Sequence, residues 1–310
     1  MAADTVSPCH DEPASKRVCV DDDSFSLTFD CTAALRTLVN VVAELLTRAE
    51  FKVTARADQP AEGTITVESI DPKQVCLVVA HLSCRLTHHS GEPRFTVNTA
   101  DFAQCLKSVP HHYAVDLAIG KASMLSMFAY EALTKTHEMH YDISTLVNDD
   151  RSVHMNDLEY DLTLEVDTHT LRRFVRTTKD LHGQEVLFRV QRPRMERGVD
   201  WKKHTILTIE SEGTTVKIRE RFHSITDMRD GSTSVIRTEH EEEVPRYCDE
   251  DMEECFQECF GAQYLSWFLK NLDRHTLTMR LSRNKPLVLT YPLGSDDESY
   301  VCLVLAARTK

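Results

Sequence analysis

The chain first becomes regular at residues 24–49, which read SFSLTFDCTAALRTLVNVVAELLTRA. Residues 24–29 alternate polar and apolar side chains, and this alternation predicts a half-buried strand. Between Leu35 and Ala49 apolar residues recur at helical spacing, and Thr32 stands where a helix cap is expected. The stretch therefore predicts a strand that leads into a helix with one apolar face. Such a helix packs on a sheet.

The same order returns in the second half of the chain. A strand at 159–166 leads into a helix at 168–182, whose apolar face includes Leu171 and Phe174. In each half further strands follow, then a second helix, then more strands. The second helices are expected at 99–108 and 261–272, and the other strands at 51–56, 64–70, 75–82, around 96, 115–119, 124–130, 136–143, 185–191, 204–211, 214–222, 234–239, 276–281, 286–291 and 300–306.

An internal repeat of about 140 residues explains this order of elements. It predicts an α+β fold of two similar halves. Residues 1–24 carry little to bury and are expected to form a disordered tail. The halves are expected at 25–143 and 160–310, joined by a polar connector at 144–159.

The overall composition is that of a soluble globular protein, with 41% hydrophobic and 27% charged residues in 310. No apolar run reaches the roughly 18 residues that a membrane span needs, so no membrane partner is expected. The ten cysteines form no CxxC pair, which favours reduced thiols in a cytosolic or nuclear compartment. Cys255 and Cys259 could share a helix face, but no set of four zinc ligands completes the pair, so no metal or cofactor is expected.

The net charge of −13 argues against a nucleic-acid binder, but the charge is unevenly distributed. The four predicted helices, with their flanking residues, together carry +4, which leaves −17 on the remainder. Most of the positive charge lies in the third helix, on Arg172, Arg173, Arg176 and Lys179. A basic helix face suits phosphate contact. Without further information, an ordinary solvated helix is the favoured interpretation of this charge.

Two charged segments leave alternatives open. Residues 189–203 contain six basic residues, including Arg192 and Arg194, and Trp201. Basic and aromatic residues together suit contact with nucleic acid, but a solvated hairpin has the same composition. Residues 239–258 contain ten Asp or Glu in twenty positions. Their spacing fits no calcium loop, so a solvated loop is favoured over a metal site.

Nothing in the sequence indicates an enzyme. It contains no GxSxG, no Gly-rich phosphate loop and no HExxH, and nine glycines leave few such loops. The His88-His89 and His111-His112 pairs fall in predicted loops, where surface histidines are common.

Four segments, in order, resemble the proliferating cell nuclear antigen family of DNA sliding clamps. They are VESIDPKQVCL at 67–77, FGAQYLSWFLK at 260–270, PLVLTY at 286–291 and LAAR at 305–308. The resemblance implies two α+β halves of the clamp type. In that family three copies form a closed ring, with helices lining the hole and sheets outside. It implies no enzymatic activity, and it places the pairing edges at 123–130 and 214–222. Closed rings also remove exposed sheet edges.

The resemblance also implies two binding surfaces. Duplex DNA would pass through the ring, and the residues that stand at basic channel positions of the family are Arg36, Lys107, Arg173, Arg176 and Lys270. Arg172 and Lys179 of the third helix are expected to contact DNA as well. Arg192 and Arg194 are further expected contacts from the basic loop, where the family has only a short turn. Ala43 and Gln104 stand where the family has basic residues. Peptides of DNA polymerases and other partners would dock in a groove beside the connector. The residues expected to line it are Ile70, Val75, Leu77, Val153, Met155, Pro286 and Ala306.

The implied role is a polymerase processivity factor that also docks repair proteins and is placed on DNA by a clamp loader. The segment PASKRVCVD at 13–21 resembles a short nuclear-import signal, so the nucleus or a viral replication site is expected. Three alternatives stay open. They are a subunit of a hetero-oligomeric checkpoint clamp, a viral processivity factor that works as a monomer or dimer, and an interaction scaffold that does not bind DNA.

Overall fold

The computed structural model describes residues 25–88, 93–119, 124–135, 138–147, 158–193, 206–225, 234–238, 252–274, 276–294, 296 and 298–308. The expected tail at 1–24, with its import-like segment, and most of the connector lie outside these residues.

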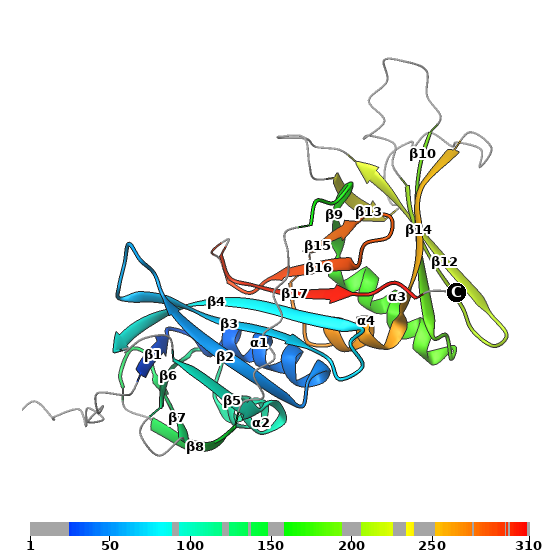
Figure 1. The fold of residues 1–310 in the computed structure, drawn as a ribbon. Coiled ribbons are helices and arrows are strands. Elements are labelled where there is room, and N and C mark those ends of the chain that lie inside the picture. The colour runs from blue at the N-terminus through cyan, green and yellow to red at the C-terminus, as the bar shows by residue number, and fades with distance from the viewer. Residues whose placement is uncertain are drawn as a thin grey trace, which may run out of the picture.

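Each half contains two helices among its strands (Figure 1). The first half contains β1 (Phe25–Phe29), α1 (Thr32–Leu45), β2 (Arg48–Ala55), β3 (Glu62–Ile70), β4 (Cys76–His88), β5 (Arg94–Asn98), α2 (Thr99–Ser108), β6 (Tyr113–Ile119), β7 (Met124–Glu131) and β8 (Glu138–Leu146). The second half contains β9 (Leu162–Asp167), α3 (Thr168–Asp180), β10 (Glu185–Pro193), β11 (Ile206–Glu212), β12 (Lys217–Ile225), β13 (Ser234–Thr238), β14 (Met252–Gly261), α4 (Ala262–Leu269), β15 (Thr276–Leu281), β16 (Leu287–Pro292) and β17 (Tyr300–Leu305). This is the α+β architecture of two similar halves that the strand–helix repeat predicts.

Hydrogen-bonded strands in the first half follow one another in a closed series. Starting from β2 the neighbours are β3, β4, β1, β6, β7, β8 and β5, and β5 pairs with β2 again. In the second half the order is β14, β10, β11, β12, β13, β9, β15, β16 and β17.

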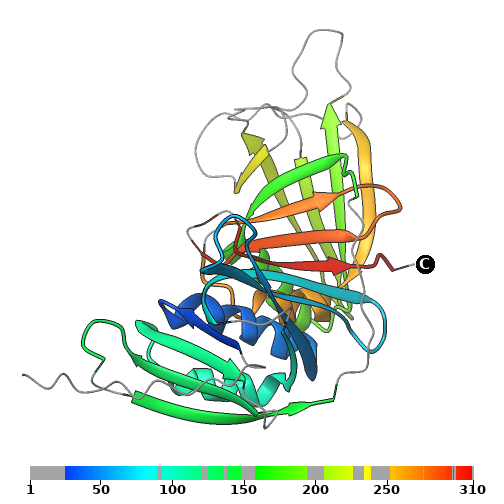
Figure 2. The ribbon, with the colours of Figure 1, turned by 60° about the vertical axis from the view of Figure 1, so that its left-hand side comes forward.

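The two halves share one sheet across their junction. Strand β17, near the C-terminus, pairs antiparallel with β4 of the first half, from Tyr300 opposite His81 to Leu305 opposite Cys76. Both views show these strands side by side, although more than 200 residues separate them in sequence (Figures 1 and 2). The six paired positions fix the register, because a shift by one residue would turn every side chain to the opposite face.

The helices lie along one face of this sheet. In Figure 1, α1, α4 and α3 follow one another beneath β4 and β17. Helix α1 packs against α2, α3 packs against α4, and α1 meets α4 across the junction. Their apolar sides bury Leu35, Phe102, Leu171 and Phe268 in one continuous core. The helix faces that carry most of the basic residues are thereby left on the side away from the sheet.

Two expectations about strands are wrong. The acidic segment 239–258 was expected to be a solvated loop, but residues 252–258 belong to β14, which pairs with β10 along its whole length. Phe256 and Phe260, four residues apart, are buried and hold β14 against the core in spite of its glutamates. Strand β8 runs to Leu146, into the expected connector, because Thr145 and Leu146 pair with β5.

Asp71, in the turn between β3 and β4, ties the halves together. Its carboxylate is buried and accepts hydrogen bonds from the backbone N–H groups of Lys73 (3.1 Å), Val75 (2.7 Å) and Cys76 (2.6 Å). It also accepts one from the hydroxyl of Tyr264 on α4, at 2.9 Å. Burial by itself raises the pKa of Asp71, but these four hydrogen bonds outweigh it, so the pKa lies below the usual value.

We expect Asp71→Asn to lower the free energy of unfolding by about 1–3 kcal/mol at pH 7, because an amide cannot accept all of these bonds. A lowered pKa stabilises the fold above the unfolded-state pKa of about 3.9 and loses that contribution as the pH falls through the folded-state value. The difference between variant and parent should therefore shrink below about pH 4. Urea unfolding at several pH values measures it.

Tyr264→Phe is the matched control for this prediction, because it removes only the bond between the halves. A loss of about 1 kcal/mol, smaller than for Asp71→Asn, is expected. Equal stability of parent and Asp71→Asn at pH 7 would contradict the role given to Asp71.

Candidate DNA-facing helices and partner groove

Two arginines occupy equivalent positions in the halves. Arg36 is the fifth residue of α1 and Arg172 the fifth residue of α3. In both, the guanidinium Nε and Nη2 are enclosed and have no hydrogen-bond partner among the described residues. Burial lowers the pKa of Arg36, whose Nη1 lies 2.9 Å from Nε2 of His111. Enclosed N–H donors without a hydrogen-bond partner destabilise the folded state, and a phosphate or water molecule that accepted from them would offset this penalty.

Other expected DNA contacts already interact with neighbours. Arg173 forms an ion pair of 2.5 Å with Glu220 on β12, and Lys270 forms one of 2.6 Å with Glu44 on α1. Lys179 donates to the hydroxyl of Ser266 at 3.3 Å. Lys107 and Arg176 are exposed near the ends of α2 and α3. The helix face is thus basic, but acidic partners balance part of its charge, as the sequence could not indicate.

The basic segment after β10 is only partly described. Arg192 lies within β10, although its side chain is not described, and Arg194 lies outside the described residues. Arg189, the first basic residue of the segment, lies 3.4 Å from Glu254 and 2.9 Å from Gln257, both on β14. Arg189 therefore connects two neighbouring strands of the sheet, β10 and β14.

The sheet face opposite the helices carries a second apolar cluster. Val79, Val288, Cys302 and Val304 are buried there, with Leu77 and the rings of Tyr160 and Tyr300 packed against them. Residues on this face alternate along β4 and β17 with residues of the main core. Of the expected groove residues, Leu77 belongs to this cluster.

Sequence reasoning missed the aromatic part of this cluster. His81 packs against Tyr300 with 4.9 Å between ring centres and the ring planes tilted by 33°. The ammonium of Lys285 lies 5.8 Å from the ring centre of Tyr160. Burial lowers the pKa of His81, although nearby Glu68 acts in the opposite direction. A signal did exist, because residues 300–305 (YVCLVL) are apolar on both faces. In a sheet with one solvated face, apolar and polar residues should instead alternate along each strand.

Three other expected groove residues line two recesses beside the C-terminal segment 306–308. Val75 and Ala306 line the larger, of about 950 Å³. Pro286 and Ala306 line the smaller, of about 690 Å³. Ile70 ends β3 and is half-buried, and it lines neither of these two recesses. Val153 and Met155 lie outside the described residues.

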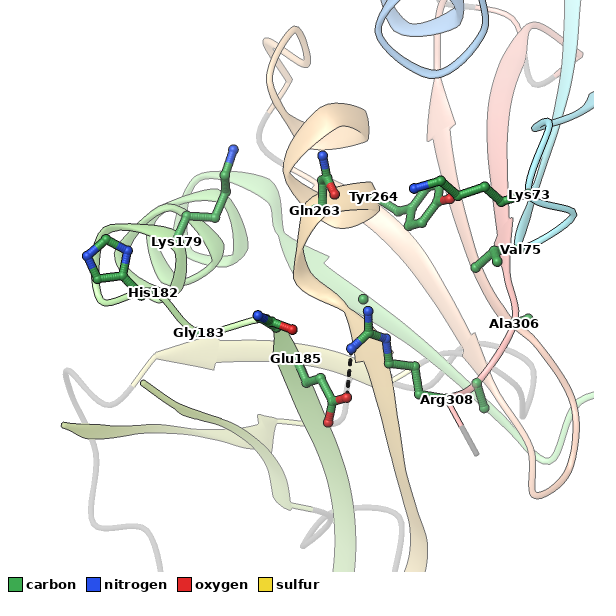
Figure 3. A pocket seen from close by; sticks show the side chains of 13 residues that line it. Lys73, Val75, Lys179, His182, Gly183, Glu185, Gln263, Tyr264, Ala306 and Arg308 are labelled. Carbon is green, nitrogen blue, oxygen red and sulfur yellow. Dashed lines mark hydrogen bonds and ion pairs between the residues drawn. The ribbon is translucent and has the colours of Figure 1, made fainter. Parts of the chain in front are cut away.

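Figure 3 shows the larger recess, which takes its walls from both halves. Lys73, from the turn after β3, and Tyr264 lie on one side, and Lys179 and His182 lie on the other. Arg308 crosses the base and pairs with Glu185 at 2.8 Å.

One expected pairing edge is wrong and the other is present in part. Residues 123–130 fall in β7, which pairs with β6 on one side and β8 on the other, so β7 is not an edge. The available edge is β8, which over 138–144 pairs only with β7 among the described residues. Strand β12 pairs with β11 throughout 217–223, but with β13 only from residue 222 onward. Its first five residues therefore form a described edge.

The rows of side chains on these two edges have opposite charge. On β8 the exposed row is Glu138, His140 and Asp142, and the alternate residues pack on the core. On β12 the corresponding row is Lys217, Arg219 and Arg221. Lys217 and Arg219 lie 3.0 and 2.8 Å from the buried carboxylate of Glu210 on β11. Burial raises the pKa of Glu210, but these two cations outweigh it and lower the pKa overall.

The described residues contain neither a candidate metal site nor a helix that could span a membrane. No group of three or more His, Cys, Asp or Glu side chains there could hold a metal ion. Within the same residues, no helix has the length and apolar composition needed to cross a bilayer.

Solved structures with this fold exist. PCNA from Thermococcus kodakaraensis matches with a TM-score of 0.66 and 18% identity, over 92% of this chain and 100% of that one. Proliferating cellular nuclear antigen from Entamoeba histolytica matches with a TM-score of 0.67 and 13% identity, over 92% and 99%. No family model matches the sequence, and no curated protein does either. The expected resemblance is confirmed at the level of the fold: the chain has the α+β clamp fold of proliferating cell nuclear antigen.

Proposed function

We propose that the protein is a non-enzymatic DNA sliding clamp that holds a DNA polymerase on duplex DNA. One observation carries the proposal: nearly the whole chain adopts the clamp fold, with the helix faces that gather its positive charge turned away from the sheet. In a ring of this fold a positive lining holds phosphates without reading bases, and an acidic exterior repels other nucleic acid. DNA repair proteins and a clamp loader would be further partners, in the nucleus or at a viral replication site.

Within this proposal, the candidate DNA contacts differ in strength. Lys107, Arg176 and Lys179 are the best placed, because they are exposed and have no acidic partner among the described contacts. Arg36 and Arg172 also lack an acidic partner there, but two guanidinium nitrogens of each are enclosed. Arg173 and Lys270 would have to exchange a carboxylate for a phosphate. Weak, redistributable contacts suit a ring that slides, because topology rather than affinity retains the DNA.

Self-assembly is favoured over a monomer and over a ring with other subunits by the charges on the two edges. If β8 of one copy paired with the free edge of β12 of the next copy, the side chains of both strands that face the core would lie on the same face of the joined sheet. The acidic row of β8 would then meet the basic row of β12. One chain carries both complementary edges, so identical copies joined head to tail can close a ring, for which we propose three copies.

Partner peptides would dock on the sheet face opposite the helices. Leu77, with Val304 and the two tyrosines of the second apolar cluster, offers an apolar surface, and Tyr160 in it directly follows the end of the expected connector. The recesses lined by Val75, Pro286 and Ala306 extend this surface past the C-terminal segment. An amphipathic one-turn helix with apolar anchors fits such a surface.

Primer extension on circular single-stranded DNA tests the clamp function. With a polymerase and loader from the same source, the chain should lengthen the products. Arg176→Glu should shorten them progressively between about 50 and 200 mM salt and lower the salt slope of DNA binding by roughly one unit per copy. Lys135→Glu, an exposed change of equal charge in the β7–β8 turn, is the control. No gain in product length with the parent chain at any salt concentration would leave only the scaffold alternative.

Charge reversal tests the edges. Glu138→Lys with Asp142→Lys should convert a ring into monomers, as measured by light scattering. Lys217→Glu with Arg221→Glu should do the same and leaves Arg219 beside Glu210. A chain with all four changes should assemble again, because the rows are complementary once more. Circular dichroism checks that each variant is folded. A parent chain that is monomeric at all concentrations, or a fourfold variant that fails to reassemble although folded, would refute the edge pairing.

A further inference from the structure

The larger recess beside the C-terminal segment is positively charged in a strongly acidic protein. Lys73, Lys179 and Arg308 line it, and Glu185 is the single carboxylate among the lining residues that the structure describes. With His182 counted as neutral, the recess carries two unbalanced positive charges, whereas the chain carries −13. These cations come from separate elements, since Lys73 follows β3, Lys179 ends α3 and Arg308 follows β17.

The recess adjoins the proposed peptide surface. Val75 and Ala306 form part of its wall, and the backbone N–H of Ala306 donates to the carbonyl of Val75 at 2.9 Å. The segment 306–308 separates it from the smaller recess, whose lining includes Leu187 and Pro286. A peptide anchored by apolar side chains on one side of this segment can therefore place its next residues among the cations on the other side.

We propose that this recess selects partner segments that carry acidic residues next to their apolar anchors. This inference rests on the proposed partner docking and names the chemistry of the partner. Acidic side chains of such a segment could approach Lys73 on one side of the recess or Lys179 on the other. They could also compete with Glu185 for Arg308, whose pair with Glu185 is about half exposed on both sides. Exposed pairs of this kind contribute modestly, so selectivity would come from several cations acting together.

The size and walls of the recess favour a peptide over DNA. About 950 Å³ accommodates a few side chains, and a duplex is too wide to enter it. Small apolar walls such as Val75 and Ala306 suit the backbone and methylene groups of a peptide. Lys179 can still contact DNA from the helix face, so the test uses Lys73 and Glu185, which are not candidate DNA contacts.

Fluorescence anisotropy with the full chain tests the selectivity. The probes are labelled synthetic peptides with apolar anchors at positions i, i+3 and i+4, flanked on either side by Glu-Glu, Gln-Gln or Lys-Lys. The Glu-Glu peptides should bind most tightly, and their advantage should decrease as salt is raised. Lys73→Glu should weaken Glu-Glu binding about fivefold or more, and Glu185→Gln, which releases Arg308, should strengthen it a few fold. Lys135→Glu should change it little.

Two results would overturn the inference. One is that the Lys-Lys or Gln-Gln peptides bind as tightly as the Glu-Glu peptides or more tightly, or that no probe binds. If primer extension still depends on the chain in that case, the clamp function stands without this selectivity. The other is that Lys73→Glu weakens duplex DNA binding and leaves peptide binding unchanged, which would assign the recess to DNA. Failure of primer extension with the parent chain would refute the clamp function separately.

Discussion

The antiparallel pairing of β4 with β17 is the interaction on which the rest of the molecule depends. It joins the last strand of the second half to a long strand of the first half and makes one sheet of the two. With the register fixed, the apolar sides of α1 and α4 meet beneath the junction, and Asp71 can reach the hydroxyl of Tyr264. The same pairing brings the C-terminal segment 306–308 beside the turn at Lys73, so the larger recess, which takes its walls from both halves, depends on it.

Charge has a different role on each surface. On the helices the positive charge is concentrated in α3, and carboxylates of neighbouring elements already balance some of it. The outward row of β12 is positive, yet the buried Glu210 lies against it and holds two of its side chains. In a chain with a net charge of −13, binding of an anionic partner would require such local reversals of sign, since the overall field repels polyanions.

The sequence was a good guide to the elements and a poorer guide to their neighbours. Helix α3 begins at the expected residue, because the apolar periodicity that predicts a helix is a local property of the sequence. In α1 the expected cap, Thr32, is instead the first helical residue, and Cys31 is the N-cap. Strand pairing is not local, so the edge expected at 123–130 is instead a strand with neighbours on both sides. The acidic strand β14 was missed because its many carboxylates indicate a solvated loop. Phe256 and Phe260 lie on one face of this strand and are buried only once β14 pairs with β10.

For the candidate sites, residue type and spacing alone were sufficient to identify the basic residues of α3, whereas the apolar groove was expected only from the resemblance to the clamp family. Only the tertiary structure decided which basic residues of the helices are balanced, since Glu220 on β12 pairs with Arg173 and Glu44 on α1 pairs with Lys270 at the end of α4. It alone brought Tyr160 and Tyr300 onto one apolar surface and gathered Lys73, Lys179 and Arg308 around one recess. The physical reason is that burial and electrostatic interactions depend on distances in space. For residues far apart in the chain, strand pairing sets these distances.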